Sequence, residues 1–277
     1  MTDILESLAL LSVLVFVIGS MLSMGLSLTT KQIIEPLRNT RLVVLALVAN
    51  FVVVPIAAYV ITLVLPLDES ISIGLILVST AAGAPFLPKL VEVAKGNTAF
   101  SVGLMVLQMV VTIVFLPIVL PLLIQGVEVN PLDIAQSLVV MMLIPLAIGL
   151  FIKARYEESA EKIRPTFASA SNLAILVLIV LGVVLNFDAM IGLVGSFGIL
   201  AAILLVAIAL ATGYLLGGSD PSIKSVMALG TGQRNISAAL VVAAQNFDAD
   251  VITYLAVFSV VGFVLLFPAA GELGKRS

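Results

Sequence analysis

Long apolar runs alternate with short polar or Pro/Gly-containing connectors along the whole chain. A transmembrane helix needs about 20 mostly apolar residues to cross the hydrocarbon core of a bilayer. By this measure we predict nine spans, at residues 5–28, 41–65, 71–88, 98–124, 132–152, 168–186, 189–217, 222–245 and 250–270. The predicted fold class is therefore an all-α membrane protein, with the lipid bilayer as an obligatory partner.

Basic residues test this count, because they concentrate in cytoplasmic loops. Lys and Arg residues follow the first, third, fifth, seventh and ninth spans and are missing after the others. Of the 13 basic residues, 12 fall on this one side: Lys31, Arg38, Arg41, Lys89, Lys95, Lys153, Arg155, Lys162, Arg164, Lys224, Lys275 and Arg276. The alternation predicts a multi-pass protein of the cell inner membrane, with its N-terminus outside and its C-terminus in the cytoplasm.

Two connectors mix apolar residues and charges at helical spacing, and each contains a proline. These segments, Thr29–Thr40 and Lys153–Phe167, are predicted to be short helices at the membrane surface.

The amino-acid composition limits the kinds of site that the chain can form. The chain of 277 residues is 61% hydrophobic and 10% charged, whereas soluble domains carry about 25% charged residues. It contains no Cys and no His, which excludes disulfides, thiolate or imidazole metal sites and His-based catalysis. We therefore expect no enzyme activity, no cofactor, no well-defined metal site and no nucleic-acid partner.

Two of the predicted spans are interrupted by residues that break helices. The breaks are carried by Gly83, Pro85 and Pro88 in the third span, and by Gly230 and Gly232 in the eighth. Unpaired backbone groups are expensive in lipid, so broken helices persist only where protein or a water-filled cavity satisfies them. Such paired interruptions indicate a transporter binding site, although two kinks that serve only helix packing are the alternative.

The two interrupted spans also resemble each other in sequence. At an offset of 149 residues, Gly83 aligns with Gly232, Ala94 with Ala243 and Asn97 with Asn246. Because the spans are five apart, they cross the membrane in opposite directions, which is typical of an inverted repeat. We predict one membrane unit of two repeats, at residues 1–130 and 131–277.

Arg234 lies in the second break, far from either end of its span. A central Arg in a membrane costs about 3 kcal/mol on insertion scales, so it needs acceptors or a cavity. Three interpretations remain open. It binds an anionic substrate as a bidentate fork, it is a tethered replacement for a metal cation, or it caps the carbonyls of the half-helix before the break.

The remaining candidate site residues are polar side chains within the apolar spans. They are Gln233, Asn235, Thr231, Asn50, Gln108 and, early in the sixth span, Asn172. Any one amide could instead be a packing contact between helices.

Several of these stretches together resemble the bile acid:sodium symporter family over nearly the whole chain. The stretches are Met24–Thr29, Asn50–Phe51 with Pro55, Gly74–Val78, Ala94–Asn97 with Ser101–Val102, and Gly230–Asn235. The resemblance implies a core domain and a panel domain, with two broken helices crossing in the core. Members have ten spans or nine, and this chain is similar to the nine-span form.

The resemblance also locates two sodium sites, and this chain departs from both. The positions of the first correspond to Leu87, Pro88, Ser101 and Met105, of which only Ser101 has a side-chain oxygen. Those of the second correspond to Gly230, Arg234 and Asn50, so a carboxylate is lost and a guanidinium is present. A fixed cation repels Na⁺, so sodium is a doubtful co-substrate.

The functional prediction is a secondary transporter of a small or amphipathic organic anion, with degenerate sodium sites. The alternatives are a sodium-coupled organic anion symporter with displaced ligands, a relative of proton-coupled or exporter-type families that share the broken-helix plan, and a receptor or scaffold that does not transport.

Overall fold

The computed structural model describes residues 2–34, 38–124, 130–185 and 195–275. Within these ranges the secondary structure is helical, without strands. The helices are α1 (Thr2–Gly25), α2 (Thr30–Ile34), α3 (Thr40–Val48), α4 (Val54–Val64), α5 (Glu69–Thr80), α6 (Leu87–Val93), α7 (Thr98–Leu123), α8 (Pro131–Leu138), α9 (Ile144–Arg155), α10 (Glu157–Leu185), α12 (Gly198–Leu216), α13 (Pro221–Gly232), α14 (Ile236–Asn246) and α15 (Ala249–Leu273).

Among the described residues, five continuous helical segments are long and apolar enough to cross a membrane. They are Thr40–Val64, Thr98–Leu123, Pro131–Arg155, Gly198–Leu216 and Ala249–Leu273, and Leu10–Gly25 and Glu69–Thr80 are shorter apolar helices. The structure therefore agrees with a multi-pass membrane protein. Each interrupted span is divided into two short helices, so length alone does not test the count of nine, which stays a prediction.

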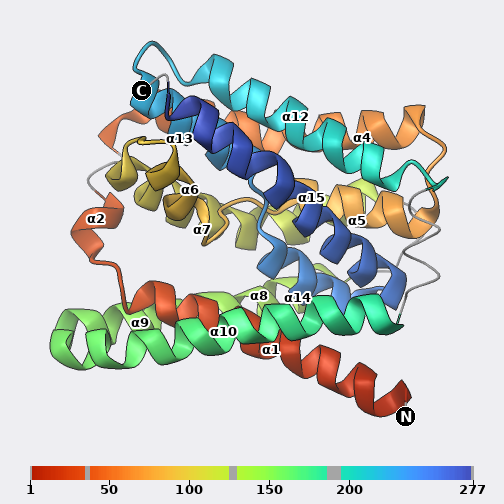
Figure 1. Ribbon diagram of the computed structural model, residues 1–277, viewed down its shortest axis with the longest axis horizontal. Helices are drawn as coiled ribbons and strands as arrows, with labels where there is room; N and C mark the ends of the chain where they lie inside the picture. Colours follow the sequence, from red (N-terminus) through yellow and green to blue (C-terminus); the bar gives the residue numbers. More distant parts are fainter. Residues whose placement is uncertain (1, 35–37, 125–129, 186–194, 276–277) are drawn as a thin grey trace.

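Two helical layers face each other (Figure 1). In one layer, α1 packs against α9 and α10. This contact is close because Gly25 and Gly149 meet: a Cβ on Gly25 would lie 2.4 Å from the Leu146 carbonyl oxygen. Small residues allow such an approach between membrane helices. In the other layer, α12 packs against α13 and α15, and α15 against α5.

Two long spans contain a π-helical turn, η2 (Ala49–Val53) between α3 and α4 and η3 (Val139–Leu143) between α8 and α9. Each turn ends two residues before a proline, Pro55 or Pro145. A proline has no N–H for the carbonyl four residues earlier, and the helix widens locally. The first π turn contains Asn50.

One predicted connector is wrong. Residues 153–167 do not form a separate surface helix, because α10 begins at Glu157 and continues through Pro165 into the apolar span. Salt bridges at helical spacing stabilise the exposed start of α10. Lys153 Nζ lies 2.9 Å from Glu157, and Lys162 Nζ lies 2.7 Å from Glu158. For the other connector, the structure has the short helix α2, and residues 35–37 lie outside the described part.

Both predicted breaks are present, but three of the residues assigned to them lie in helices: Pro88 in the first turn of α6, and Gly230 and Gly232 in the last turn of α13. A proline is tolerated at a helix start because the first N–H groups have no partner within the helix. Residues 81–86 separate α5 from α6, and residues 233–235 separate α13 from α14. The element order and these breaks are compatible with two repeats, and the inverted relation itself remains a prediction.

Candidate functional site

The two breaks lie against each other in the layer that contains α5, α12, α13 and α15, and Asn235 joins them. Its backbone N–H donates to the Ala81 carbonyl at 2.9 Å, and its side-chain Nδ2 donates to the carbonyls of Ala82 at 3.3 Å and Gly83 at 3.1 Å. Its Oδ1 accepts from the N–H of Ala238 and so caps α14. One asparagine therefore satisfies backbone groups of both breaks.

The first break is also held by α7. The hydroxyl of Thr112 accepts from the Ala82 N–H at 2.9 Å and donates to the Ala82 carbonyl at 3.0 Å. Gly83 has φ +79°, and a Cβ there would lie 2.3 Å from the backbone nitrogen of Met109. Only glycine fits this turn, because both the backbone conformation and the space exclude a side chain.

Arg234 extends from the second break to the end of α5. Its Nε donates to the Val78 carbonyl at 3.2 Å and its Nη2 to the Ser79 carbonyl at 2.5 Å. Its Nη1 donates to the Thr231 carbonyl at 3.2 Å and to Asn50 Oδ1 at 2.7 Å. The side chain is 4% exposed.

These acceptors explain why a buried cation is stable here. The last carbonyls of a helix have no partner within the helix, and the C-terminal end of the helix dipole is negative. The C-terminal ends of α5 and α13 converge on the guanidinium, which pairs with carbonyls of both. Arg234 thus neutralises the ends of two half-helices at once.

Asn50 connects this cluster to the neighbouring span. Besides accepting from Arg234, it donates to the hydroxyl of Thr231 at 3.3 Å and to the Ala46 carbonyl at 2.9 Å. The π turn places its side chain inward, where it is fully buried.

An apolar cluster occupies the neighbouring part of the core. Leu87, at the start of α6, is 1% exposed. A Cβ on Gly230 would lie 3.2 Å from Leu87 Cδ2 and 3.5 Å from Leu104 Cδ2, so both leucines pack onto this glycine. Here the hydroxyl of Ser101 donates to the Thr98 carbonyl of its own helix at 2.7 Å.

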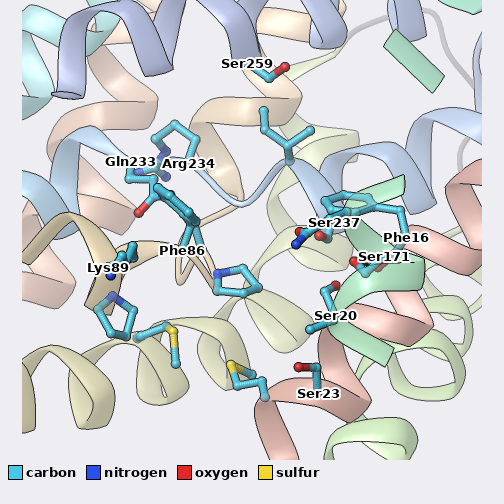
Figure 2. A pocket seen from close by; sticks show the side chains of 18 of the residues that line it. Phe16, Ser20, Ser23, Phe86, Lys89, Ser171, Gln233, Arg234, Ser237 and Ser259 are labelled. Atoms are coloured by element: carbon cyan, nitrogen blue, oxygen red, sulfur yellow. Dashed lines mark hydrogen bonds between the residues drawn. The ribbon is translucent and has the colours of Figure 1, made fainter. Parts of the chain in front are cut away.

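A cavity of about 480 Å³ lies between the two layers and reaches both breaks. Figure 2 shows Ser20, Ser23 and Ser171 across the cavity from Gln233 and Arg234. Its wall combines hydroxyl groups with aromatic rings. The serines are Ser20, Ser23, Ser27, Ser171, Ser237 and Ser259, and the aromatic residues are Phe16, Phe86, Phe258 and Phe263.

Besides Arg234, three charged residues line the cavity: Lys89, Glu92 and Arg164. Lys89 Nζ is 2.7 Å from Glu92, so these two charges compensate each other. The guanidinium of Arg164 is then the uncompensated charge of the three, on an exposed residue. By the charge alternation, all three belong to the predicted cytoplasmic side.

The layers meet again near the other end of α14. The Ser137 hydroxyl on α8 donates a short hydrogen bond to Gln245 Oε1, and Gln245 Nε2 lies 3.9 Å from Met141 Sδ. Helix α14 also packs on α1. These contacts join the two layers beyond the residues that line the cavity.

Most of the predicted site residues do come together. Arg234, Thr231, Asn50 and Asn235 form the hydrogen-bonded cluster at the breaks. Five predicted residues line the cavity beside Arg234: Gln233, Pro85, Pro88, Gly232 and Asn172.

Gln108 and Ser101 do not line the cavity. Gln108 is fully buried, and neither its Oε1 nor its Nε2 has a hydrogen-bond partner among the described groups. The cavity serines and Arg164 were missed, because a single serine in an apolar helix is indistinguishable from a small packing residue. The spacing of Ser20 and Ser23 on one face of α1, with Ser27 in the turn that follows, is the signal that could have found them.

Comparison with known proteins decides the family. The model of the sodium bile acid symporter family matches residues 13–193. The chain belongs to this family. An uncharacterized sodium-dependent transporter, YocS, of Bacillus subtilis is 29% identical over 147 residues, which are 51% of this chain and 44% of that protein.

Two plant relatives match as well. The probable sodium/metabolite cotransporter BASS2 of Oryza sativa is 31% identical over 144 residues, covering 52% of this chain and 34% of that protein. The corresponding BASS1 of Arabidopsis thaliana is 24% identical over 232 residues, covering 82% of this chain and 58% of that protein. The matched regions thus span only a third to just over half of these relatives. All three names describe transporters.

Proposed function

We propose that this chain is a secondary transporter that carries a small or amphipathic organic anion through the cavity between its two layers. The observation that carries the proposal is the cavity itself, which reaches two broken helices and contacts a buried, fixed guanidinium. Broken helices at a cavity are the typical binding sites of secondary transporters.

Electrostatics favours an anion. Arg234 keeps its charge in the membrane interior, and Arg164 adds an uncompensated positive charge among the exposed lining residues. Four of the five guanidinium N–H groups of Arg234 can be assigned to protein acceptors, so its main effect on a substrate is through its field. The opposing serines and aromatic rings suit a substrate with an apolar body and hydroxyl or carboxylate groups.

We further propose that the sodium sites of the family are degenerate in this chain. Leu87, at a position of the first site, presents methyl groups that pack with those of Leu104 against Gly230, a position of the second site. At the second, the guanidinium of Arg234 binds the carbonyls and the Asn50 oxygen that could otherwise face a cation. Na⁺ needs several oxygen ligands, and a positive charge in their midst repels it.

One observation favours a second candidate, a sodium-coupled symporter with displaced ligands. The Oε1 atoms of Gln108 and Gln233 are buried without hydrogen-bond partners. Amide oxygens are suitable ligands for a hard cation. A saturable dependence of uptake on Na⁺ would select this candidate.

The test begins with a ligand-stabilisation screen of the purified protein against organic acids, with and without Na⁺, followed by uptake into proteoliposomes. We expect Arg234→Ala to reduce uptake to background and Arg234→Lys to restore about a tenth of it, because an ammonium keeps the charge but cannot bond the carbonyls of both half-helices as the planar guanidinium does. Arg155→Ala removes an exposed Arg that does not line the cavity and should transport normally.

Uptake must be expressed per folded molecule, because Arg234→Ala also leaves buried carbonyls unpaired and will lower stability. Folding can be followed by circular dichroism, since the chain has no Trp and no Cys to report it. Wild-type uptake by a folded Arg234→Ala protein would refute the proposal that this charge serves transport.

A further inference from the structure

The core contains its own permanent replacement for a bound cation. In a symporter, a dissociable ion neutralises the carbonyl ends of broken helices, and its binding and release couple its gradient to the substrate. Here the carbonyls of Val78, Ser79 and Thr231 are bonded to a guanidinium that is covalently part of the chain. This charge is never released.

The place of the other cation is filled with hydrocarbon. Leu87, which the resemblance assigns to the first sodium site, packs with Leu104 against Gly230, and both leucines are buried. A cation would have to displace these side chains and would then find methyl groups where it needs oxygen ligands. Binding an ion would therefore stabilise neither of these two positions.

The buried side chains also lack a proton carrier within the described ranges. The buried polar residues there are Ser, Thr, Asn and Gln together with Arg234, and include no Asp, Glu, His or Lys. Tyr254 is buried, but its hydroxyl is engaged with the Gly198 carbonyl at 3.3 Å. Arg does not exchange protons usefully at physiological pH.

We propose that the empty carrier changes between its two orientations without any coupling ion, so that transport follows the electrochemical gradient of the anion alone. The inference rests on the proposed transport function and specifies how it is driven. Because the helix-end carbonyls are permanently bonded to Arg234, no ion has to bind them before the layers can move. Each monovalent anion then carries one net negative charge across the membrane, and an inside-positive potential accelerates its entry.

For the cavity to face the other side, the contacts between the layers near the end of α14 must separate. They include the hydrogen bond of Ser137 to Gln245 and the approach of Gln245 to Met141, and α14 also packs on α1. These are uncharged groups, so opening this side separates no ion pair there. Removing the Gln245 side chain should shift the carrier toward the orientation that faces outside.

The test measures the orientation directly and needs no substrate. Because the chain has no Cys, single cysteines can be introduced without other changes. Ser23→Cys on α1 and Ser259→Cys on α15 each place a thiol on the cavity wall, one in each layer. A charged, membrane-impermeant thiol reagent is applied from the outside to proteoliposomes of known orientation, in sodium, potassium or choline chloride at equal ionic strength.

We expect both thiols to react from outside at rates that agree within twofold among the three salts, and at least threefold faster when Gln245→Ala is added. In the double variant Gly230→Glu/Arg234→Gln, which returns a carboxylate and an amide to the breaks, the rate should become dependent on Na⁺. A wild-type rate that changes with Na⁺ along a saturation curve would overturn the proposal, as would no outside labelling in any salt.

The labelling separates this inference from the transport function. Salt-independent labelling without uptake of any anion would reject transport of the tested substrates and leave ion-free alternation standing. Sodium-dependent labelling with anion uptake would do the reverse. Where uptake is found, imposed potassium diffusion potentials with valinomycin should change its initial rate at least twofold in choline medium, and a rate indifferent to potential would contradict transport of the anion alone.

Discussion

The two helix breaks are built from opposite chemistry. Residues 81–86, between α5 and α6, are Ala, Gly, Pro and Phe and contribute backbone acceptors. Residues 233–235, between α13 and α14, are Gln, Arg and Asn and contribute side-chain donors. The bonds of Arg234 and Asn235 cross from the second break to the carbonyls of the first and of the helix that precedes it.

This difference shows how an apolar break survives inside a membrane. A carbonyl that is left unpaired in hydrocarbon costs several kcal/mol, and the first break has no side chain of its own that could satisfy it. The second break and Thr112 of α7 supply the missing partners. The two breaks are therefore one structural unit, and a substitution in the second should also destabilise the first.

The largest effect is expected when the direction in which each broken span crosses the membrane is tested. If they are inverted, α5 begins outside and α13 begins in the cytoplasm. Single-cysteine variants Ser70→Cys and Ser219→Cys, at those two starts, should be labelled all-or-none from opposite sides by an impermeant reagent. Labelling of both from one side would refute the predicted topology, and Ser159→Cys provides an independent cytoplasmic reference.

The next largest effect is expected at the turn of the first break. Gly83→Ala places a Cβ 2.3 Å from the Met109 backbone at a φ of +79°, so we expect a loss of about 4 kcal/mol. Unfolding by SDS, followed by circular dichroism, measures the change. The matched control is Gly262→Ala in α15, where no atom lies within 4 Å, and it should be neutral or gain up to about 1 kcal/mol. Equal stability of the two variants would show that the turn is not strained.

Two asparagine caps can be compared to separate the effect of the hydrogen bonds between the breaks from the effect of helix capping. Asn235→Ala removes the cap of α14 and both bonds to the first break, and should cost about 3 kcal/mol. Asn97→Ala removes only the exposed cap of α7 and should cost about 1 kcal/mol. The same SDS titration compares them, and a similar loss in both would mean that the bonds between the breaks add nothing.

The smallest effect is expected where α7 supports the first break. Thr112→Val preserves shape but removes the hydroxyl that bonds both sides of Ala82, a loss of about 1 to 2 kcal/mol. Thr212→Val, whose hydroxyl bonds only the Ile208 carbonyl of its own helix, should change stability by less than about 0.5 kcal/mol. If the order of these two variants were reversed, α7 would have no supporting role.

Much of this architecture is predictable from the sequence because it depends on local composition. The long apolar runs, both interruptions and the importance of Arg234 follow from hydropathy, from Gly and Pro, and from the cost of a charge in lipid. The error at residues 153–167 has a local cause too, since charges and Pro165 resemble a connector when the salt bridges of α10 are unknown.

The partners of these residues could not be predicted in the same way. Capping was considered for the half-helix that precedes Arg234, and the Thr231 carbonyl fulfils it, but Val78 and Ser79 belong to the other broken span. Gln108 was expected at the site as a polar side chain within an apolar span, and it instead lies buried without a hydrogen-bond partner among the described groups. How two helices cross depends on packing between residues more than 150 positions apart.

Hydropathy and the positions of Gly, Pro and charge along the chain thus predict a membrane protein, the places where its helices break and the charge that is buried among them. The interactions of that charge depend on the three-dimensional fold, because hydrogen-bond partners are set by position in space. The crossing of α5 and α13 brings two sets of orphan carbonyls to one point, and a single guanidinium has the right number of donors to satisfy them.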